Sequence, residues 1–155
     1  SQGHEIGSHS FSHPQITTLT SEEIEYQFTE TEHRIQQYVP YTTKLIRPPY
    51  GQITQSLKEV LQKTFVLWSI DTQDWKTRDK DAIVSEVLNN VKDGDIILMH
   101  DMYSTTADAC EELIPALIER GYQLVTVSEL LNAKEITPVA GSVYSRVLST
   151  GNAAS

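Results

Sequence analysis

The hydrophobic positions of the chain alternate between a helical spacing and short, nearly continuous apolar runs. A period near 3.6 residues marks a helix with one buried face, whereas a short apolar run marks a strand that is buried on both faces. The first pattern predicts helices at residues 20–39, 55–62, 83–91 and 113–118, with a further small helix from Ser128. The second pattern, together with a short mixed segment at residues 5–7, predicts strands at residues 5–7, 45–47, 65–70, 96–99 and 123–127.

Capping and turn residues mark the ends of several of these elements. Thr20 and Glu23 stand three apart, as in a capping box, at the start of the first helix. Gly121 follows the fourth helix, where a glycine commonly closes the last turn. Pro48-Pro49 excludes both a helix and a strand ladder, so the second strand ends before it.

Five strands separated by four helices predict an α/β fold in which parallel strands are joined by right-handed crossovers. A complete barrel of this kind has eight strands. We therefore expect a partial (β/α) barrel of about five parallel strands and four helices, completed by strands that are missing from this chain. Residues 1–131 would form this domain, and residues 132–155 a C-terminal extension or wrapping arm.

Composition narrows the classes of partner. The 155 residues carry 12 Lys and Arg against 21 Asp and Glu, a net charge of −9, so nucleic acid is a poor partner because an acidic surface repels phosphates. No apolar run reaches the roughly 18 residues of a membrane span. The single cysteine, Cys110, allows neither an internal disulfide nor a thiolate metal cage.

Polar residues follow four of the predicted strands. They are His9 and His13 after the first strand, residues 47–50 after the second, residues 71–75 after the third, and His100 with Asp101 after the fourth. The carboxyl ends of parallel barrel strands share one rim, and active sites form there. The sequence therefore predicts an active site built from these four clusters.

The spacing of His9 and His13 would let two imidazole nitrogens converge on one divalent ion. Taken alone, this spacing is more often that of surface or hydrogen-bonded histidines. Two imidazoles also leave the site one ligand short of the three that a catalytic zinc-type centre usually takes from the protein.

His100 ends an apolar strand, where a neutral imidazole could act as a general acid or base if Asp74 or Asp101 held its other nitrogen. The alternative is a histidine that simply hydrogen-bonds a neighbouring strand. Arg47 could orient a carboxylate through its planar fork, or form an ordinary surface pair.

Two further positions offer groups for binding. Tyr50-Gly51 presents backbone N–H groups at a turn where an oxyanion could be met. Trp75 offers a flat apolar face to a sugar ring, although packing in the core is the commoner role of a tryptophan.

Together these clusters resemble the motifs of the polysaccharide deacetylase (NodB-homology) domain of carbohydrate esterase family four. Residues 9–13 resemble H-[ST]-x-x-H, residues 47–50 R-x-P-Y, residues 71–75 D-x-x-D-W, and residues 97–101 the final leucine-x-histidine-aspartate motif. The resemblance extends from residue 3 to about 131. It is strongest to bacterial peptidoglycan N-acetylglucosamine deacetylases.

The resemblance implies metal-dependent hydrolysis of N-acetyl groups from N-acetylglucosamine residues of a cell-wall polysaccharide, with release of acetate. Peptidoglycan is the polysaccharide expected. It also implies a bacterial, extracytoplasmic setting, secreted or attached to the cell surface. The metal is expected to be zinc, with cobalt or nickel as alternatives.

The roles implied for single residues follow the family motifs. His9 and His13 would hold the metal. His100 would be the general acid, Asp74 would keep its ring charged, Arg47 would pin the catalytic aspartate, and the Tyr50 backbone N–H would meet the oxyanion. The substrate-binding positions implied by the resemblance are Trp75, Leu98 and Pro49.

One motif of the family, a threonine-phenylalanine-aspartate-aspartate-glycine stretch on an earlier strand, is absent from the sequence. Its two aspartates are the catalytic base and the third metal ligand. Residues 1–131 are therefore expected to be the C-terminal part of a deacetylase domain, with the missing N-terminal portion as a partner and little activity alone.

Three alternatives remain open at this level. The substrate could be chitin or acetylated xylan, because the motifs surround the acetyl group and not the rest of the sugar. The segments Lys76–Lys80 and Tyr103–Asp108, expected as loops, would decide this choice. The chain could also be a non-catalytic glycan-binding piece, because it lacks the base.

Overall fold

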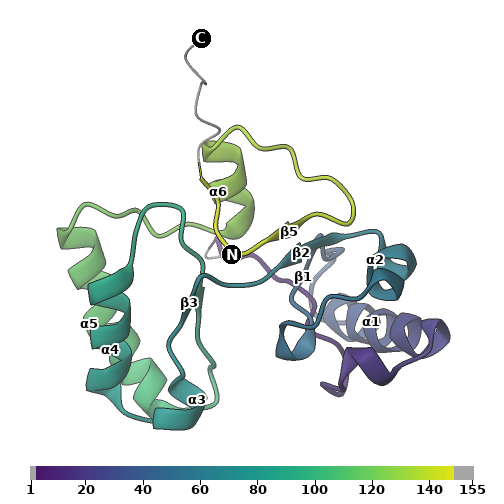
Figure 1. Ribbon diagram of the computed structural model, residues 1–155, viewed down its shortest axis with the longest axis horizontal. Helices are drawn as coiled ribbons and strands as arrows, with labels where there is room; N and C mark the ends of the chain where they lie inside the picture. The colour runs from purple at the N-terminus through teal and green to yellow at the C-terminus, as the bar shows by residue number, and fades with distance from the viewer. Residues whose placement is uncertain (1–2, 149–155) are drawn as a thin grey trace. The chain divides into compact units, whose positions relative to one another are not determined.

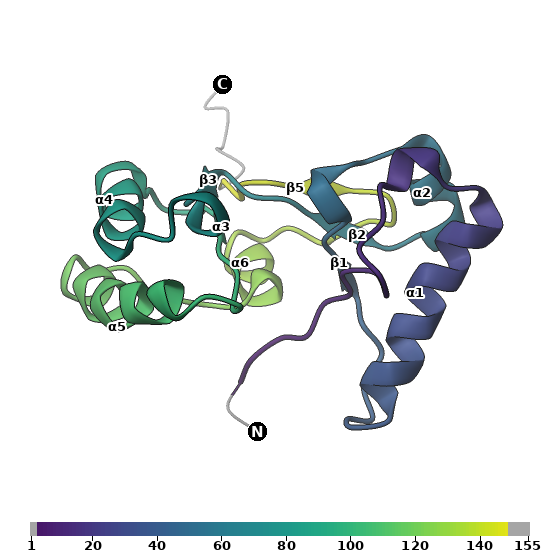
Figure 2. The same ribbon diagram turned by 90° about the horizontal axis from the view of Figure 1, so that it is seen from below.

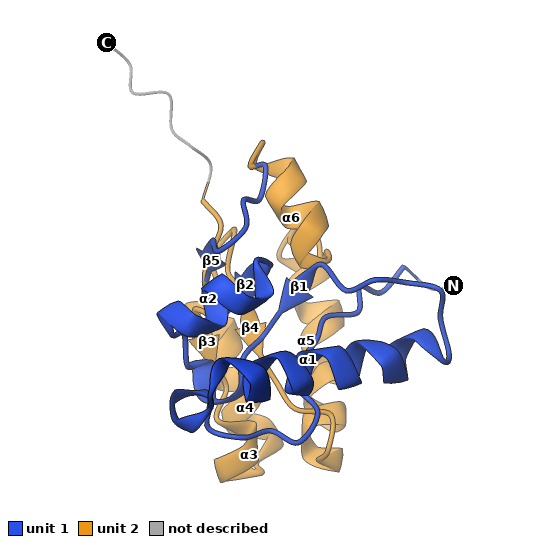
Figure 3. Ribbon diagram, turned by 90° about the vertical axis from the view of Figure 1, so that its right-hand side faces the viewer, with its two compact units in different colours: residues 1–67, 137–144 blue, residues 68–136, 145–155 orange. Residues whose placement is uncertain are grey.

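The computed structural model describes residues 3–148 and divides the chain into two compact units (Figure 3). Unit 1 comprises Ser1–Leu67 and Thr137–Tyr144, and unit 2 comprises Trp68–Ile136 and Ser145–Ser155. All strand pairs in both units are parallel, and helices accompany each sheet (Figure 1). The predicted α/β class is confirmed.

Within residues 3–148, unit 1 contains a three-stranded parallel sheet and two α-helices. Its strands are β1 (Leu45–Ile46), β2 (Thr64–Val66) and β5 (Val143–Tyr144), in the order β1-β2-β5. Its helices are the 3-10 turn η1 (Ile16–Thr18), α1 (Ser21–Gln36), the 3-10 turn η2 (Pro49–Gly51) and α2 (Gln55–Leu61). Their apolar faces form one core, made of Ile16, Ile24, Phe28, Ile46, Leu57 and Phe65.

In the described part of unit 2 there are a two-stranded parallel sheet and four helices. Its strands are β3 (Ile70–Asp71) and β4 (Ile97–Leu98), and its helices are α3 (Asp74–Thr77), α4 (Lys80–Asn90), α5 (Ser104–Glu119) and α6 (Val127–Ala133). Helices α4 and α5 lie side by side (Figures 1 and 2). They enclose a second core, made of Ile70, Ile83, Val84, Val87, Ala109, Leu113 and Leu117.

Both helix-end signals in the sequence are confirmed. The Thr20 hydroxyl accepts from the backbone N–H of Glu23, and the Glu23 carboxylate accepts from the backbone N–H of Thr20, which completes the capping box. At the end of α5, Gly121 adopts a φ of 85° and the N–H of Tyr122 bonds to the carbonyl of Leu117 at 3.0 Å. This is the Schellman arrangement that satisfies the last carbonyls of a helix.

The apolar run at residues 65–70 does not form the single central strand that its pattern predicts. It forms β2 and β3, which belong to different sheets, and residues 67–69 between them form no strand. The two sheets divide the run because β2 pairs with β1 and β5, whereas β3 pairs with β4.

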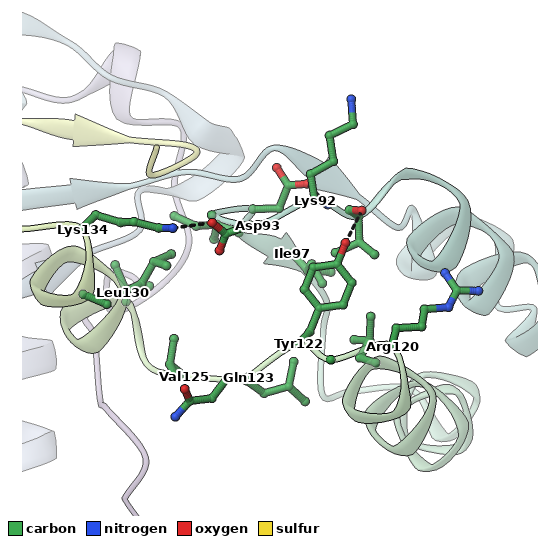
Figure 4. Close-up of a pocket in the computed structure, with 18 residues that line it drawn as sticks. Lys92, Asp93, Ile97, Arg120, Tyr122, Gln123, Val125, Leu130 and Lys134 are labelled. Atoms are coloured by element: carbon green, nitrogen blue, oxygen red, sulfur yellow. Dashed lines mark hydrogen bonds and ion pairs between the residues drawn. The ribbon is translucent and has the colours of Figure 1, made fainter. Parts of the chain in front are cut away.

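The predicted strand at residues 123–127 is wrong. A strand exists only where a neighbour accepts its backbone hydrogen bonds, and within residues 3–148 no strand pairs with this segment. Val127 instead begins α6, capped by Thr126. The rest of the segment lines a cavity of about 640 Å³ (Figure 4), where the Tyr122 hydroxyl donates to the Val91 carbonyl at 3.0 Å.

The turn between α4 and β4 fixes the last described residues of the chain. Asp95 forms an antiparallel bridge and an ion pair with Arg146, and the N–H of Val147 bonds to the carbonyl of Gly94 at 2.8 Å. Burial raises the pKa of Asp95, but hydrogen bonds from Arg146 and Ser69 outweigh it and lower the pKa overall. A carboxylate is thus kept ionised where the tail docks.

The domain boundary at residue 131 and the extension at residues 132–155 stay predictions, and residues 149–155 lie outside the described part of the chain. Within residues 3–148, no helix combines the length and the apolarity that crossing a membrane requires.

Gly94→Ala should destabilise unit 2 far more than Gly121→Ala. Both glycines have a φ near 85°, at 86° and 85°, but a Cβ at Gly94 would stand 1.9 Å from the Val147 carbonyl oxygen, whereas a Cβ at Gly121 would meet nothing within 4 Å. We expect Gly121→Ala to lower the free energy of unfolding by about 1–2 kcal/mol through backbone strain alone. Gly94→Ala should cost at least about 2 kcal/mol more. Urea unfolding of both variants measures the difference, and equal losses would contradict the clash.

Candidate functional site

The site residues indicated by the sequence fall into two groups, one in each unit. Unit 1 holds His9, His13, Arg47, Pro49 and Tyr50, and unit 2 holds Asp74, Trp75, Leu98 and His100. Each group is described within its own unit.

His9 follows the point where the chain touches β1. Ser8 forms a parallel bridge with Ile46, and the N–H of Arg47 bonds to the Ser8 carbonyl at 3.0 Å. His9 Nδ1 then lies 2.5 Å from the carbonyl oxygen of Arg47. A carbonyl can only accept, so Nδ1 carries the proton and Nε2 is the basic nitrogen of the neutral ring. Metal-binding histidines are typically oriented in this way.

His13 lies beside both His9 and Tyr50. The ring centroids of His9 and His13 are 4.9 Å apart, and those of His13 and Tyr50 are 4.7 Å apart. His13, Tyr50 and Ser10 have φ values of 57°, 56° and 65°, which non-glycine residues rarely adopt. Such conformations persist only where the surroundings over-determine them, and they cluster at functional sites.

The guanidinium of Arg47 makes no hydrogen bond or ion pair with the residues at 3–148 that the structure describes. It is half-buried, and burial lowers the pKa of Arg47 by removing water from the cation. Guanidinium groups in such settings are usually paired. The adjoining Pro48 and Pro49 are fully buried and hold the turn that carries Tyr50.

The imidazoles of His9 and His13 are suitable as two of the ligands of a divalent ion. Two imidazoles, one with a fixed tautomer, are nitrogen donors of the kind that zinc, cobalt and nickel accept. Over the described residues, no group of three or more His, Cys, Asp or Glu side chains could hold an ion. The source of a third ligand stays a prediction.

In unit 2 the carboxylate of Asp74 is fully buried, with an exposed fraction of 0%. His100 contacts it twice, through its backbone N–H to Oδ2 at 2.6 Å and through Nδ1 to Oδ1 at 2.8 Å. The Thr106 hydroxyl donates to Oδ2 at 2.9 Å, and the N–H of Trp75 lies 2.9 Å from Oδ1. Burial raises the pKa of Asp74, but the hydrogen bonds from His100 and Thr106 outweigh it and lower the pKa overall.

The two strands of unit 2 bring this group together. Asp71 of β3 pairs with Leu98 of β4, and the Thr72 hydroxyl donates to the Leu98 carbonyl at 2.8 Å. Asp74 and His100 therefore follow paired strands at the same end. Trp75 lies on the short helix α3 and is 49% exposed, whereas Leu98 is buried.

Thr106 is a site residue that the sequence did not single out. Its segment, Tyr103–Asp108, was expected to be a loop, but α5 begins at Ser104 and Thr106 is buried in its first turn. The sequence gives no sign of this role, because a threonine that faces inward and one that faces solvent look alike in a helix start.

Comparison with known proteins finds similarity to polysaccharide deacetylases in both the family model and the curated relatives. The sequence model of the polysaccharide deacetylase family matches residues 1–66. The chain is 44% identical over 134 residues to peptidoglycan-N-acetylmuramic acid deacetylase PdaC of Bacillus subtilis, and 36% identical over 133 residues to peptidoglycan-N-acetylglucosamine deacetylase PgdA of Listeria monocytogenes. Each match covers 86% of this chain. The chain spans only 29% and 28% of these two relatives.

A solved structure also resembles this fold. It is a family 4 acetyl xylan esterase from Clostridium thermocellum in complex with a cobalt ion. The two share 32% sequence identity with a TM-score of 0.88, over 94% of this chain and 73% of the esterase chain.

Thr106→Val should raise the pKa of Asp74, because the hydroxyl bond favours the ionised carboxylate. We expect the free energy of unfolding at neutral pH to fall by about 1–3 kcal/mol, the range for a hydrogen bond to a charged group. A lowered native pKa stabilises the fold above the ordinary value of 3.8, so the gap to the wild type should narrow as the pH falls through the native pKa.

Urea unfolding at neutral and acidic pH measures this gap. Thr106→Ser keeps the hydroxyl and should retain the pH dependence of the wild type. A valine variant whose stability follows the wild-type pH profile would contradict the bond to Asp74.

Proposed function

Because this chain belongs to the polysaccharide deacetylase family, carbohydrate esterase family 4, we propose that it takes part in hydrolysing N-acetyl groups of a cell-wall polysaccharide. The products would be acetate and a glycan with free amino groups. The observation that carries the proposal is the pair of Asp74 and His100, in which a fully buried carboxylate orients an imidazole at the carboxyl end of β4.

We propose that His9 and His13 hold a divalent metal ion, zinc first, with cobalt or nickel as alternatives. Such an ion, when bound, polarises an amide carbonyl and lowers the pKa of water toward roughly 7. The tautomer of His9, set by the Arg47 carbonyl, presents Nε2 as its donor. A carboxylate from outside the described residues would be the third ligand, and a second one would pair with the Arg47 guanidinium and act as the base.

His100 would be the general acid. An amide nitrogen leaves poorly unless it is protonated. Because Nδ1 of His100 faces Asp74, the proton delivered to the leaving nitrogen would come from Nε2. The imidazole is 26% exposed while the Asp74 carboxylate is fully buried, so substrate can reach the ring and the carboxylate can only stabilise its charge.

The substrate contacts are also proposals. The Tyr50 backbone N–H would meet the developing oxyanion, a contact worth about 3 kcal/mol in comparable sites. Leu98 would border the acetyl methyl group. The exposed ring of Trp75 would face a sugar, and Pro49, itself buried, would shape the groove through the turn that it holds.

We propose that the substrate is N-acetylglucosamine of peptidoglycan and that the protein acts in an extracytoplasmic, bacterial setting. N-acetylmuramic acid is the second candidate, because the relative with 44% identity is named for that sugar. Chitin and acetylated xylan are further candidates. Acetylated xylan is included because the similar solved structure is named an acetyl xylan esterase. A non-catalytic glycan-binding role is the remaining alternative.

The full-length protein should release acetate from peptidoglycan, and EDTA should abolish this activity until zinc or cobalt is restored. Acetylglucosamine oligomers, chitin and acetylated xylan are the comparison substrates. Mass spectrometry of the digested glycan would assign the free amine to glucosamine or muramic acid. No acetate from any of these glycans, with metal supplied, would refute the deacetylase proposal and favour glycan binding.

His100→Ala in the full-length protein should cut turnover at least about a hundredfold, the low end for general acid–base catalysis. Zinc affinity should stay unchanged, because the imidazole is assigned to proton transfer. His33→Ala, at an exposed histidine on α1, is the matched control and should retain full turnover. Near-normal turnover in the His100 variant would remove it from the mechanism.

A further inference from the structure

The loop that carries both proposed metal ligands has little backbone support of its own. We call residues 9–14 the histidine loop. Over the described residues, no backbone group of residues 10–14 is hydrogen-bonded to another backbone group. Ser8, just before the loop, does form such bonds, with Leu45 and Arg47. The conformation of the histidine loop therefore depends on side chains.

Gln27, on α1, contacts this loop through both polar atoms of its side-chain amide. Its Oε1 accepts from the backbone N–H of Phe11 at 3.0 Å and from that of Ser12 at 2.9 Å. Its Nε2 donates to the Ser12 hydroxyl at 2.9 Å. One amide group thus holds Phe11 and Ser12, two of the three residues that lie between His9 and His13.

Aromatic contacts on the same helix reinforce this hold. The Phe11 ring lies edge-on to Tyr26, with centroids 6.4 Å apart, and the Arg34 guanidinium lies 5.8 Å from the Phe11 centroid. Glu30 fixes Arg34 through an ion pair of 2.7 Å. Side chains of α1 at positions 26, 27, 30 and 34 therefore form a template for the loop.

Helix α1, which carries the template, is anchored in the core of unit 1. Ile24 and Phe28, with exposed fractions of 0% and 5%, enter the core of unit 1. On the loop side, Ser10 and His13 have positive φ values, which are strained for residues other than glycine and need support from their surroundings. Gln27 provides that support midway between them.

We propose that Gln27 is a positioning residue that pre-orders His9 and His13 for metal binding. The inference rests on the proposed metal site. Without the Gln27 amide, the N–H groups of Phe11 and Ser12 would bond to water and the loop would populate other conformations. Metal affinity would then fall in proportion to the fraction of molecules that still hold the loop in its binding conformation.

The test compares zinc affinity, by isothermal titration calorimetry, among four forms of the full-length protein. Gln27→Met keeps the length and helix propensity of the side chain but removes its hydrogen bonds. Gln27→Glu keeps the acceptor oxygen, and the Ser12 hydroxyl can donate to it. Gln36→Met is the matched control, because Gln36 lies on the same helix and its side chain bonds to Glu32 at 3.1 Å and, among the described residues, to none of the histidine loop.

We expect Gln27→Met to weaken zinc binding by about tenfold or more, in the range found for groups that orient metal ligands. Gln27→Glu and Gln36→Met should stay within about threefold of the wild type, and thermal melting should show all three variants folded. A loss of less than about fivefold in the methionine variant, or an equal loss in the glutamate variant, would overturn the inference.

A second readout separates this inference from the proposed function. Hydrogen exchange of the Phe11 and Ser12 amides in metal-free protein should be faster in Gln27→Met than in the wild type or Gln36→Met. Unchanged exchange would overturn the positioning role whatever the metal result. If the wild type bound no zinc, the proposed metal site would fail, while exchange would still report whether Gln27 orders the loop.

Discussion

The buried carboxylate of Asp74 is the group on which unit 2 depends. A charge without water is costly unless every lone pair is satisfied. Four donors from three elements meet this requirement: two on His100 after β4, the Thr106 hydroxyl on α5, and the N–H of Trp75 on α3. The need to satisfy one carboxylate therefore ties these elements together and fixes the imidazole at the same time.

Each unit holds one histidine through its Nδ1 atom. The acceptor for His9 is the backbone carbonyl of Arg47, and the acceptor for His100 is the buried carboxylate of Asp74. In both rings Nε2 is then the nitrogen that the proposed roles use, metal ligation at His9 and proton delivery at His100. The two proposed roles thus depend on the same kind of contact to Nδ1.

Much of the candidate site could be predicted from sequence because its residues follow strands. His9, Arg47, Asp74 and His100 each come within a few residues of a predicted strand end, and they meet in two pairs: His9 contacts the Arg47 carbonyl, and Asp74 holds His100. The helix ends were equally local, since Thr20 and Gly121 act through bonds a few residues away. Thr106 and Gln27 escaped notice because their partners are 32 and 15–16 residues distant.

The sequence by itself determined the α/β class, the helix caps and the order of the polar clusters, because these follow from hydrophobic periodicity and short-range hydrogen bonds. Only the tertiary structure decided which apolar runs became strands. Residues 65–70 were divided between two sheets, and residues 123–125 stayed unpaired, because a strand is a relation between distant segments. The same holds for Asp74 and Gln27, whose roles depend on which donors or amides the fold brings to them.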